Sequence, residues 1–166
     1  MFHLAFWDFG HELYRSTPQT FPATFLVGNV RDPAFLPPGQ VSTKAPDTPC
    51  PDLCSLTSFC SLRGRVSAIY AARFFHLFSE GGQVEVACKL ASLLSPEPGS
   101  TVFGIHIGSL HRPPANSFTA SFCHSRESWR ELWEDKVFAG HSVKIDSTLS
   151  ASGSDEYLLT WSVVRL

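Results

Sequence analysis

Residues Leu62 to Gly108, "LRGRVSAIYAARFFHLFSEGGQVEVACKLASLLSPEPGSTVFGIHIG", decide the fold. The small and apolar residues of "RVSAIYA" (65–71) predict a strand buried on both faces, and "STVFGIHIG" (100–108) predicts a second such strand. Between them, residues 80–94 carry an apolar stripe at helical spacing, and "PEPG" ends that helix. Two buried strands joined by a helix are most simply a parallel, right-handed βαβ crossover.

The flanking segments predict further elements. Residues 6–15 suit a short helix, and "ATFLVGNV" (23–30) predicts a buried strand. The stretch "SRESWRELWEDKVF" (125–138) predicts an amphipathic helix that is capped by Ser125 and turns its tryptophans inward. The alternating ending, 142–166, predicts an antiparallel hairpin. The predicted fold class is therefore α/β, with a parallel core and an antiparallel C-terminal hairpin.

Length and composition favour a single domain. A chain of 166 residues with 43% hydrophobic composition can bury one moderate core, so we assign residues 1–166 to one domain.

Residues 37–61 are rich in Pro, Ser and Thr and lack a period, which predicts a long loop with one helical turn near "DLCSL". Loops of this length are typical of lids or of disordered segments.

Charge and cysteine usage narrow the classes of partner. Lys and Arg number 13 against 15 Asp and Glu, so the net charge of -2 gives no reason to expect nucleic acid or an anionic membrane. No apolar run approaches a membrane span, and the first residues lack a basic leader. Five cysteines without a CxxC pair favour reduced thiols and a cytoplasmic location. Their irregular spacing also argues against a metal site such as zinc.

The same stretch belongs to a wider pattern. Together with "FWDFGHELYRST" (6–17), "FLVGNVRDPAFL" (25–36), "FCHSRESWRELW" (122–133) and "LLTWSVVRL" (158–166), it resembles fungal class I methyltransferases of small-molecule secondary metabolism, meroterpenoid pathways included. The resemblance implies a Rossmann-like sheet, S-adenosyl-L-methionine as cofactor and a small-molecule acceptor, with oxygen as the expected accepting atom.

The resemblance also implies what the sequence does not contain. In that family, a Gly-rich loop and a second strand ending in a ribose-binding acid come first, and Met1 falls on the place of that acid. We therefore expect the chain to correspond to a C-terminal half to two-thirds of the enzyme and to bind the cofactor weakly or not at all by itself. The family strand order, 3-2-1-4-5-7-6, would put two absent strands between residues 23–30 and 65–71. We expect residues 1–36 to attach loosely, leaving a sheet edge open to a protein partner or a second copy.

Ligands of open α/β sheets sit beyond the carboxyl ends of the strands, so the candidate cofactor-binding residues are Asn29, Val30 and Ala71. The resemblance implies that Asn29 and the Val30 amide face adenine. The Asn29 amide can donate to and accept from a ring edge, although an asparagine beside Gly28 also suits a turn. Small residues such as Ala71 and Ala72 allow close approach of a cofactor or tight packing.

Methyl transfer needs positioning more than a nucleophile. Aromatic walls from Tyr70, Phe74, Phe75 and Trp129 or Trp133 would provide it, although core packing explains the same residues. His76 and His106 are the candidates for a catalytic base, and a carboxylate acceptor would need none.

Two alternatives to an active methyltransferase remain at the level of sequence. One is a non-catalytic remnant of such an enzyme, and it could serve as a protein-interaction module. The other, a nucleotide-dependent oxidoreductase, is disfavoured because no GxGxxG motif follows a strand.

Overall fold

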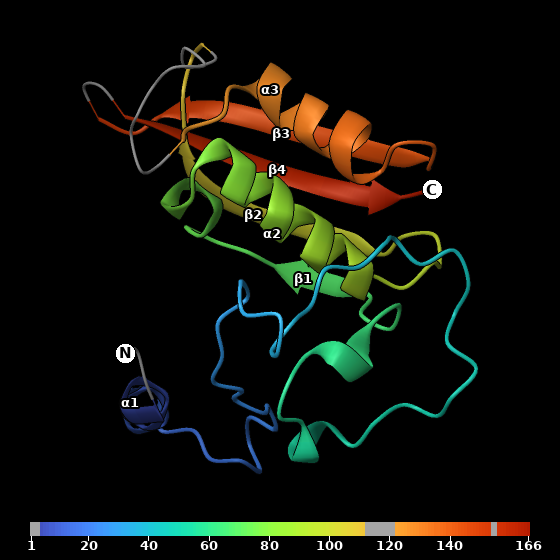
Figure 1. Ribbon diagram of the computed structural model, residues 1–166. Helices are drawn as coiled ribbons and strands as arrows, with labels where there is room; N and C mark the ends of the chain where they lie inside the picture. Colours follow the sequence, from blue (N-terminus) through green and yellow to red (C-terminus); the bar gives the residue numbers. More distant parts are fainter. Residues whose placement is uncertain (1–3, 112–121, 154–155) are drawn as a thin grey trace.

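A mixed four-stranded sheet carries helices on one face (Figure 1). The computed structural model describes residues 4–111, 122–153 and 156–166. The strands lie in the order β1-β2-β4-β3. The bounds are α1 Leu4–Tyr14, η1 Leu53–Ser55, η2 Cys60–Leu62, β1 Ala68–Tyr70, η3 Phe75–Leu77, α2 Glu80–Leu93, β2 Thr101–Gly108, α3 Arg126–Glu131, η4 Leu132–Val137, β3 Val143–Ala151 and β4 Tyr157–Arg165.

The predicted βαβ unit and hairpin are confirmed. Strands β1 and β2 are parallel and are joined through α2, while β4 is antiparallel to both β2 and β3. This is the order that the methyltransferase resemblance implies for the last four strands of its sheet. Helix α2 begins where the Ser79 side chain accepts from the Gly82 amide, and it ends before the two prolines of "PEPG".

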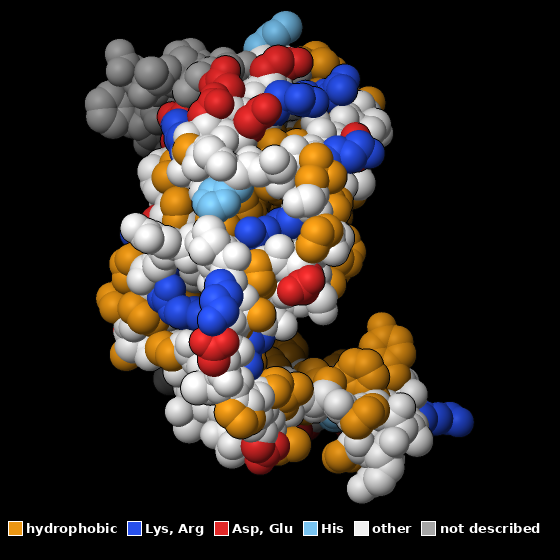
Figure 2. Space-filling view, turned by 90° about the vertical axis from the view of Figure 1, so that its right-hand side faces the viewer, with side chains coloured by type: hydrophobic (Ala, Val, Ile, Leu, Met, Phe, Trp, Pro, Cys, Tyr) orange, Lys and Arg blue, Asp and Glu red, His pale blue; other side chains and the backbone are white. Residues whose placement is uncertain are grey.

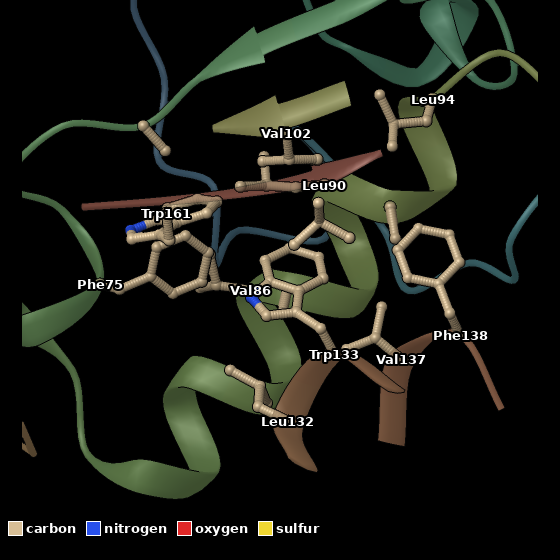
Figure 3. Packing of buried hydrophobic residues seen from close by; sticks show 14 of the residues in the cluster. Phe75, Val86, Leu90, Leu94, Val102, Leu132, Trp133, Val137, Phe138 and Trp161 are labelled. Atoms are coloured by element: carbon tan, nitrogen blue, oxygen red, sulfur yellow. The ribbon is translucent and has the colours of Figure 1, made fainter. Parts of the chain in front are cut away.

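The core lies between the helices and one face of the sheet. Alternate residues of β2 and β4, among them Val102, Trp161 and Val163, point toward α2, α3 and η4. Figure 3 shows Trp133 and Phe75 packed between the helical layer and Trp161. Phe75, Trp129 and Trp133 are fully buried, so their apolar area contributes most to this core.

The helix over 125–138 begins as predicted at Ser125, whose side chain accepts from the Ser128 amide in a capping box. The α-helical hydrogen bonding ends at Glu131, and a π-helical turn, η4, continues to Val137. The wider turn leaves both Trp129 and Trp133 buried, which confirms their predicted inward orientation.

Two expectations about strands are wrong. Residues 23–30 form no strand: none of the described strands pairs with them, and a turn begins at Asn29. Strand β1 is shorter than "RVSAIYA" and is not buried on both faces: Tyr70 is 66% exposed. No helix of the described residues covers the face of the sheet on which Tyr70 contacts Phe103 (Figure 1).

The N-terminal residues divide into a detached part and an attached part. Helix α1 stands apart from the sheet in Figure 1, with Phe6, Phe9 and Leu13 more than half exposed. Figure 2 shows a lobe with hydrophobic side chains that projects from the body. Phe35 and Leu36, in contrast, belong to the buried core. The expectation of loose attachment therefore describes α1 but not the residues near Leu36.

Basic side chains attach the irregular segment 30–48 to the body by donating to its backbone carbonyls. We call this segment the strap. The donors and acceptors are Lys89 to Val30 and Arg31, Arg63 to Pro37 and Pro38, Arg165 to Ser42, and Arg65 to Thr48. The strap is therefore held in place although it contains no helix or strand.

Candidate functional site

A groove of about 920 Å³ opens between the outer edge of β1 and residues 26–30. It lies beside the carboxyl end of β1, where parallel strands of open sheets bind ligands. Its walls come from the strap and the residues before it, from β1 and the turn that follows it, and from α2. The lining residues are Leu26, Gly28, Asn29, Val30, Phe35, Phe59, Ile69, Tyr70, Ala71, Ala72, Phe74, Phe78 and Leu90.

Local hydrogen bonds position Asn29. The Asn29 side-chain oxygen accepts from the Arg31 amide at 3.0 Å, and its backbone carbonyl accepts from the Asp32 amide at 2.9 Å. The turn that sequence reasoning left open is therefore present, and it leaves the side-chain NH₂ of Asn29 to donate to a ligand.

Two glycines allow the walls of the groove to come together. A side chain at Gly28 would overlap the ring of Phe35, and one at Gly104 would overlap the carbonyl oxygen of Ala71. The Ala71 amide donates to Phe103 O at 2.9 Å, which continues the contact between β1 and β2 beyond the strand. Ala71 is consequently fixed at the groove by backbone geometry.

The structure brings the three predicted cofactor-binding residues together, since Asn29, Val30 and Ala71 all line this groove. The predicted aromatic walls divide into two sets. Tyr70 and Phe74 line the groove, whereas Phe75, Trp129 and Trp133 are core residues.

The two candidate histidines do not line the groove: His106 is buried on β2, and His76 lies in η3 and is partly buried. Their ring centroids are 6.4 Å apart, and the two rings are roughly parallel. His106 is fully buried, and its Nδ1 accepts from Trp161 Nε1 at 3.0 Å. Burial, with the neighbouring His124 and His76, lowers the pKa of His106 to about 3. Burial and Arg73 lower the pKa of His76. Both rings are therefore neutral at pH 7.

Sequence reasoning missed three groove residues that come from irregular segments or turns: Phe35, Phe59 and Phe78. No periodicity marks such positions, so the pattern contained no signal for them. It also missed Lys89, whose buried ammonium contacts the strap next to Asn29. A signal was present there, because a lysine stands within the apolar run "VACKLASLL".

The lining of the groove is chemically compatible with a flat, uncharged ring. Its lining is mostly apolar and aromatic, with no acidic or basic residue among the lining side chains. Aromatic walls with one amide donor suit the adenine part of S-adenosyl-L-methionine. The same lining supplies no charged partner for the carboxylate and ammonium of the methionine part. The residues present therefore fit one end of that cofactor.

Other features of the described residues lie away from this groove or lack a metal-binding group. An apolar hollow of about 420 Å³ on α1, lined by Phe6, Trp7 and Phe21 among others, is far from the strand ends. Within residues 4–111, 122–153 and 156–166, no three His, Cys, Asp or Glu side chains are grouped to hold a metal ion. In the same ranges, no helix has the length and hydropathy to span a membrane.

Known proteins similar to this chain are fungal methyltransferases. The O-methyltransferase phiE of a fungal species is 29% identical over 137 residues, which cover 80% of this chain and 38% of phiE. The Asnovolin E/Chermesin D methyltransferase nvfJ of Aspergillus novofumigatus is 28% identical over 63% of this chain and 41% of nvfJ. The O-methyltransferase atr3 of Stereocaulon alpinum is 31% identical over 53% of this chain and 27% of atr3.

The chain thus spans about two fifths or less of the length of these relatives. No protein-family model matches it. Among solved structures, the mitomycin 7-O-methyltransferase MmcR superposes with a TM-score of 0.42 and 13% identity, over 60% of this chain and 30% of MmcR. The sequence relatives agree with the resemblance stated above: the chain is similar to fungal methyltransferases.

Proposed function

We propose that this chain takes part in S-adenosyl-L-methionine-dependent methyl transfer to a small-molecule acceptor, with oxygen as the accepting atom, in secondary metabolism. The main support for the proposal is that Asn29, Val30 and Ala71 all line one aromatic groove, which lies beside the end of a parallel strand. The similarity to fungal methyltransferases supports it independently.

In this proposal the groove holds the adenine ring. The Asn29 side-chain NH₂ donates to a ring nitrogen, and the Val30 backbone amide contacts the ring edge. The small side chain of Ala71 allows the ring to approach the backbone at the end of β1. Phe74 and Tyr70 supply apolar walls that exclude water from the ring. The bound cofactor supplies an electrophilic methyl group on a sulfonium.

A hydroxyl acceptor must lose its proton, and His76 and His106 are the candidates to take it. Of the two, His76 is better suited because it is only partly buried, whereas His106 is fully buried and its Nδ1 already accepts from Trp161. A base with a pKa of about 3 also takes up a proton poorly at neutral pH. A carboxylate acceptor would require neither histidine.

We further propose that these 166 residues alone bind the cofactor weakly, since the sequence holds no Gly-rich loop and the groove has no charged side chain. Several missing hydrogen bonds at roughly 1.5–3 kcal/mol each would shift micromolar binding to the millimolar range. Calorimetric titration with adenosine and with S-adenosyl-L-methionine tests both points. We expect millimolar dissociation constants for the two ligands.

The control variants are matched by residue type. Asn29→Ala should weaken adenosine binding further, while Gln19→Ala, in the exposed turn after α1, should not. A micromolar constant for S-adenosyl-L-methionine would contradict the expectation of weak binding. Equal adenosine binding by wild type and Asn29→Ala would contradict the proposed role of Asn29.

A second candidate function is a protein-interaction module. The observation in its favour is that β1 occupies the edge of the sheet and pairs with β2 alone among the described strands. An unpaired edge can take an additional strand from another chain. Light scattering over a range of concentrations tests self-association. Ala68→Lys on β1 should abolish any dimer formed through this edge, whereas a dimer that survives the substitution must use another surface.

A further inference from the structure

Lys89 lies inside the protein, with only 1% of its side chain exposed. Its ammonium donates to the carbonyl oxygens of Val30 and Arg31, both at 3.1 Å, and it forms an ion pair with Glu85 at 2.9 Å. An ammonium has three hydrogens, so these three acceptors satisfy it completely.

A buried ammonium costs free energy that an apolar side chain would not, even when it is fully paired. The neighbouring positions of α2, among them Val86, Leu90 and Leu93, are buried and apolar. An apolar residue at position 89 would therefore suit the core itself. What it could not do is hold two consecutive carbonyls of the strap.

Those carbonyls belong to the turn that carries Asn29. The Arg31 amide donates to the Asn29 side chain and the Asp32 amide donates to the Asn29 carbonyl, so residues 29–32 form one hydrogen-bonded unit. Leu90, the next residue after Lys89 on α2, lines the groove. Lys89 thus connects the two sides of the groove through one side chain.

We propose that Lys89 is a positioning residue, which fixes the Asn29–Val30 turn relative to α2 and thereby sets the width of the adenine groove. This inference rests on the proposed function for what the groove binds, but not for the attachment itself. Glu85 supports the arrangement from the other side, because its carboxylate also pairs with Arg31 at 3.4 Å. Arg31 is about half exposed, so this outer pair contributes less than the buried one.

The test compares Lys89→Met with Lys89→Arg and with Arg65→Met in the full chain. Methionine keeps the length of the side chain and removes the donors, whereas arginine keeps donors. Arg65 donates to the strap at Thr48, which does not line the groove, so Arg65→Met controls for general loosening of the strap. The readouts are hydrogen exchange at the amides of Asp32, Phe35 and Leu36, and the dissociation constant of adenosine.

We expect Lys89→Met to speed exchange at these three amides at least tenfold and to weaken adenosine binding at least tenfold. Lys89→Arg should retain most of the exchange protection and most of the adenosine affinity. Arg65→Met should leave the exchange rates and the dissociation constant within twofold of wild type. Unchanged exchange in Lys89→Met would overturn the proposal, and so would unchanged adenosine binding in a variant with faster exchange. If the wild-type chain bound no adenosine, the proposed function would fail, and exchange would still decide whether Lys89 fixes the turn.

The global unfolding transition distinguishes a positioning role of Lys89 from a role in stability alone. If Lys89 served only stability, Lys89→Met would lower both the unfolding midpoint and the protection of the β2 amides from exchange. A positioning residue changes exchange near Asn29 while Val102 to Ile105 stay protected. Should Lys89→Met not fold, Lys89→Gln serves in its place, because its shorter side chain carries two donor hydrogens for three acceptors and should hold the turn less firmly. Exchange equal to wild type in that variant would overturn the proposal.

Discussion

Trp161 and His106 are joined across neighbouring strands: the indole Nε1 of Trp161 donates to Nδ1 of His106 at 3.0 Å in the buried layer. The bond requires the neutral imidazole with its proton on Nε2. Burial opposes protonation as well, and the pKa of His106 is lowered to about 3. The stability of the fold therefore depends on pH through this pair.

The first prediction concerns this coupling. The unfolded chain takes up a proton at His106 near pH 6.5, but the folded chain does so only near pH 3. Stability is therefore fully present above pH 6.5 and is lost progressively as the pH falls toward 3, by about 2 kcal/mol at pH 5. Urea unfolding at pH 7.5 and at pH 5 measures the loss. His106→Gln, which keeps an acceptor for Trp161, should lose about 2 kcal/mol less between these pH values than wild type.

The second prediction concerns the approach of β1 to β2. Gly104→Ala places a methyl group against the carbonyl oxygen of Ala71, which is backbone and cannot move aside easily. We expect a loss of about 1–3 kcal/mol in the free energy of unfolding. Gly81→Ala on α2 is the matched control, since nothing lies within 4 Å of its new side chain. It should stabilise the helix by about 0.5–1 kcal/mol. Equal effects of the two substitutions would contradict the close approach.

The third prediction contrasts two phenylalanines. Phe75 is fully buried against Trp129, Trp133 and Trp161, so Phe75→Ala should cost about 3–5 kcal/mol. Phe103 lies on the uncovered face of the sheet and is 39% exposed, so Phe103→Ala should cost less than about 1.5 kcal/mol. Chemical unfolding of both variants checks the difference. A large loss for Phe103→Ala would show that this face is covered in solution.

The fourth prediction uses hydrogen exchange along the chain. The amides of residues 25–27 belong to no strand, whereas Val102 to Ile105 lie in β2 between two hydrogen-bonded neighbours. Exchange should be fast at the first site and slow at the second. Slow exchange at residues 25–27 would show that they join the sheet after all.

The sequence predicted the helices and strands that have a regular apolar periodicity. Helix α2 and strands β2, β3 and β4 follow from apolar periodicity together with their flanking turn residues. Residues 23–30 have the composition of a strand, but a strand also needs a neighbour, and composition does not reveal whether one is present. For the same reason, the exposure of Tyr70 could not be anticipated from an apolar run.

The candidate site was predictable only in part. Asn29, Val30 and Ala71 followed from the rule that ligands bind beyond strand ends, and they do line one groove. The opposite wall could not be derived, since Phe35 and Phe59 reach it through irregular backbone whose course depends on tertiary contacts. The prediction that Asn29, Val30 and Ala71 bind the cofactor awaits the titrations described above.

Attachment of the strap through backbone carbonyls has a consequence for mutation. Every residue type presents a carbonyl, and Pro37 and Pro38 do so without an amide hydrogen that would need a partner of its own. Most side chains of residues 40–47 can therefore be exchanged with little loss of anchorage, whereas Lys89, Arg63 and Arg165 cannot. A library of random substitutions should accordingly accept changes widely from Gln40 to Asp47 and reject them at Lys89, Arg63 and Arg165.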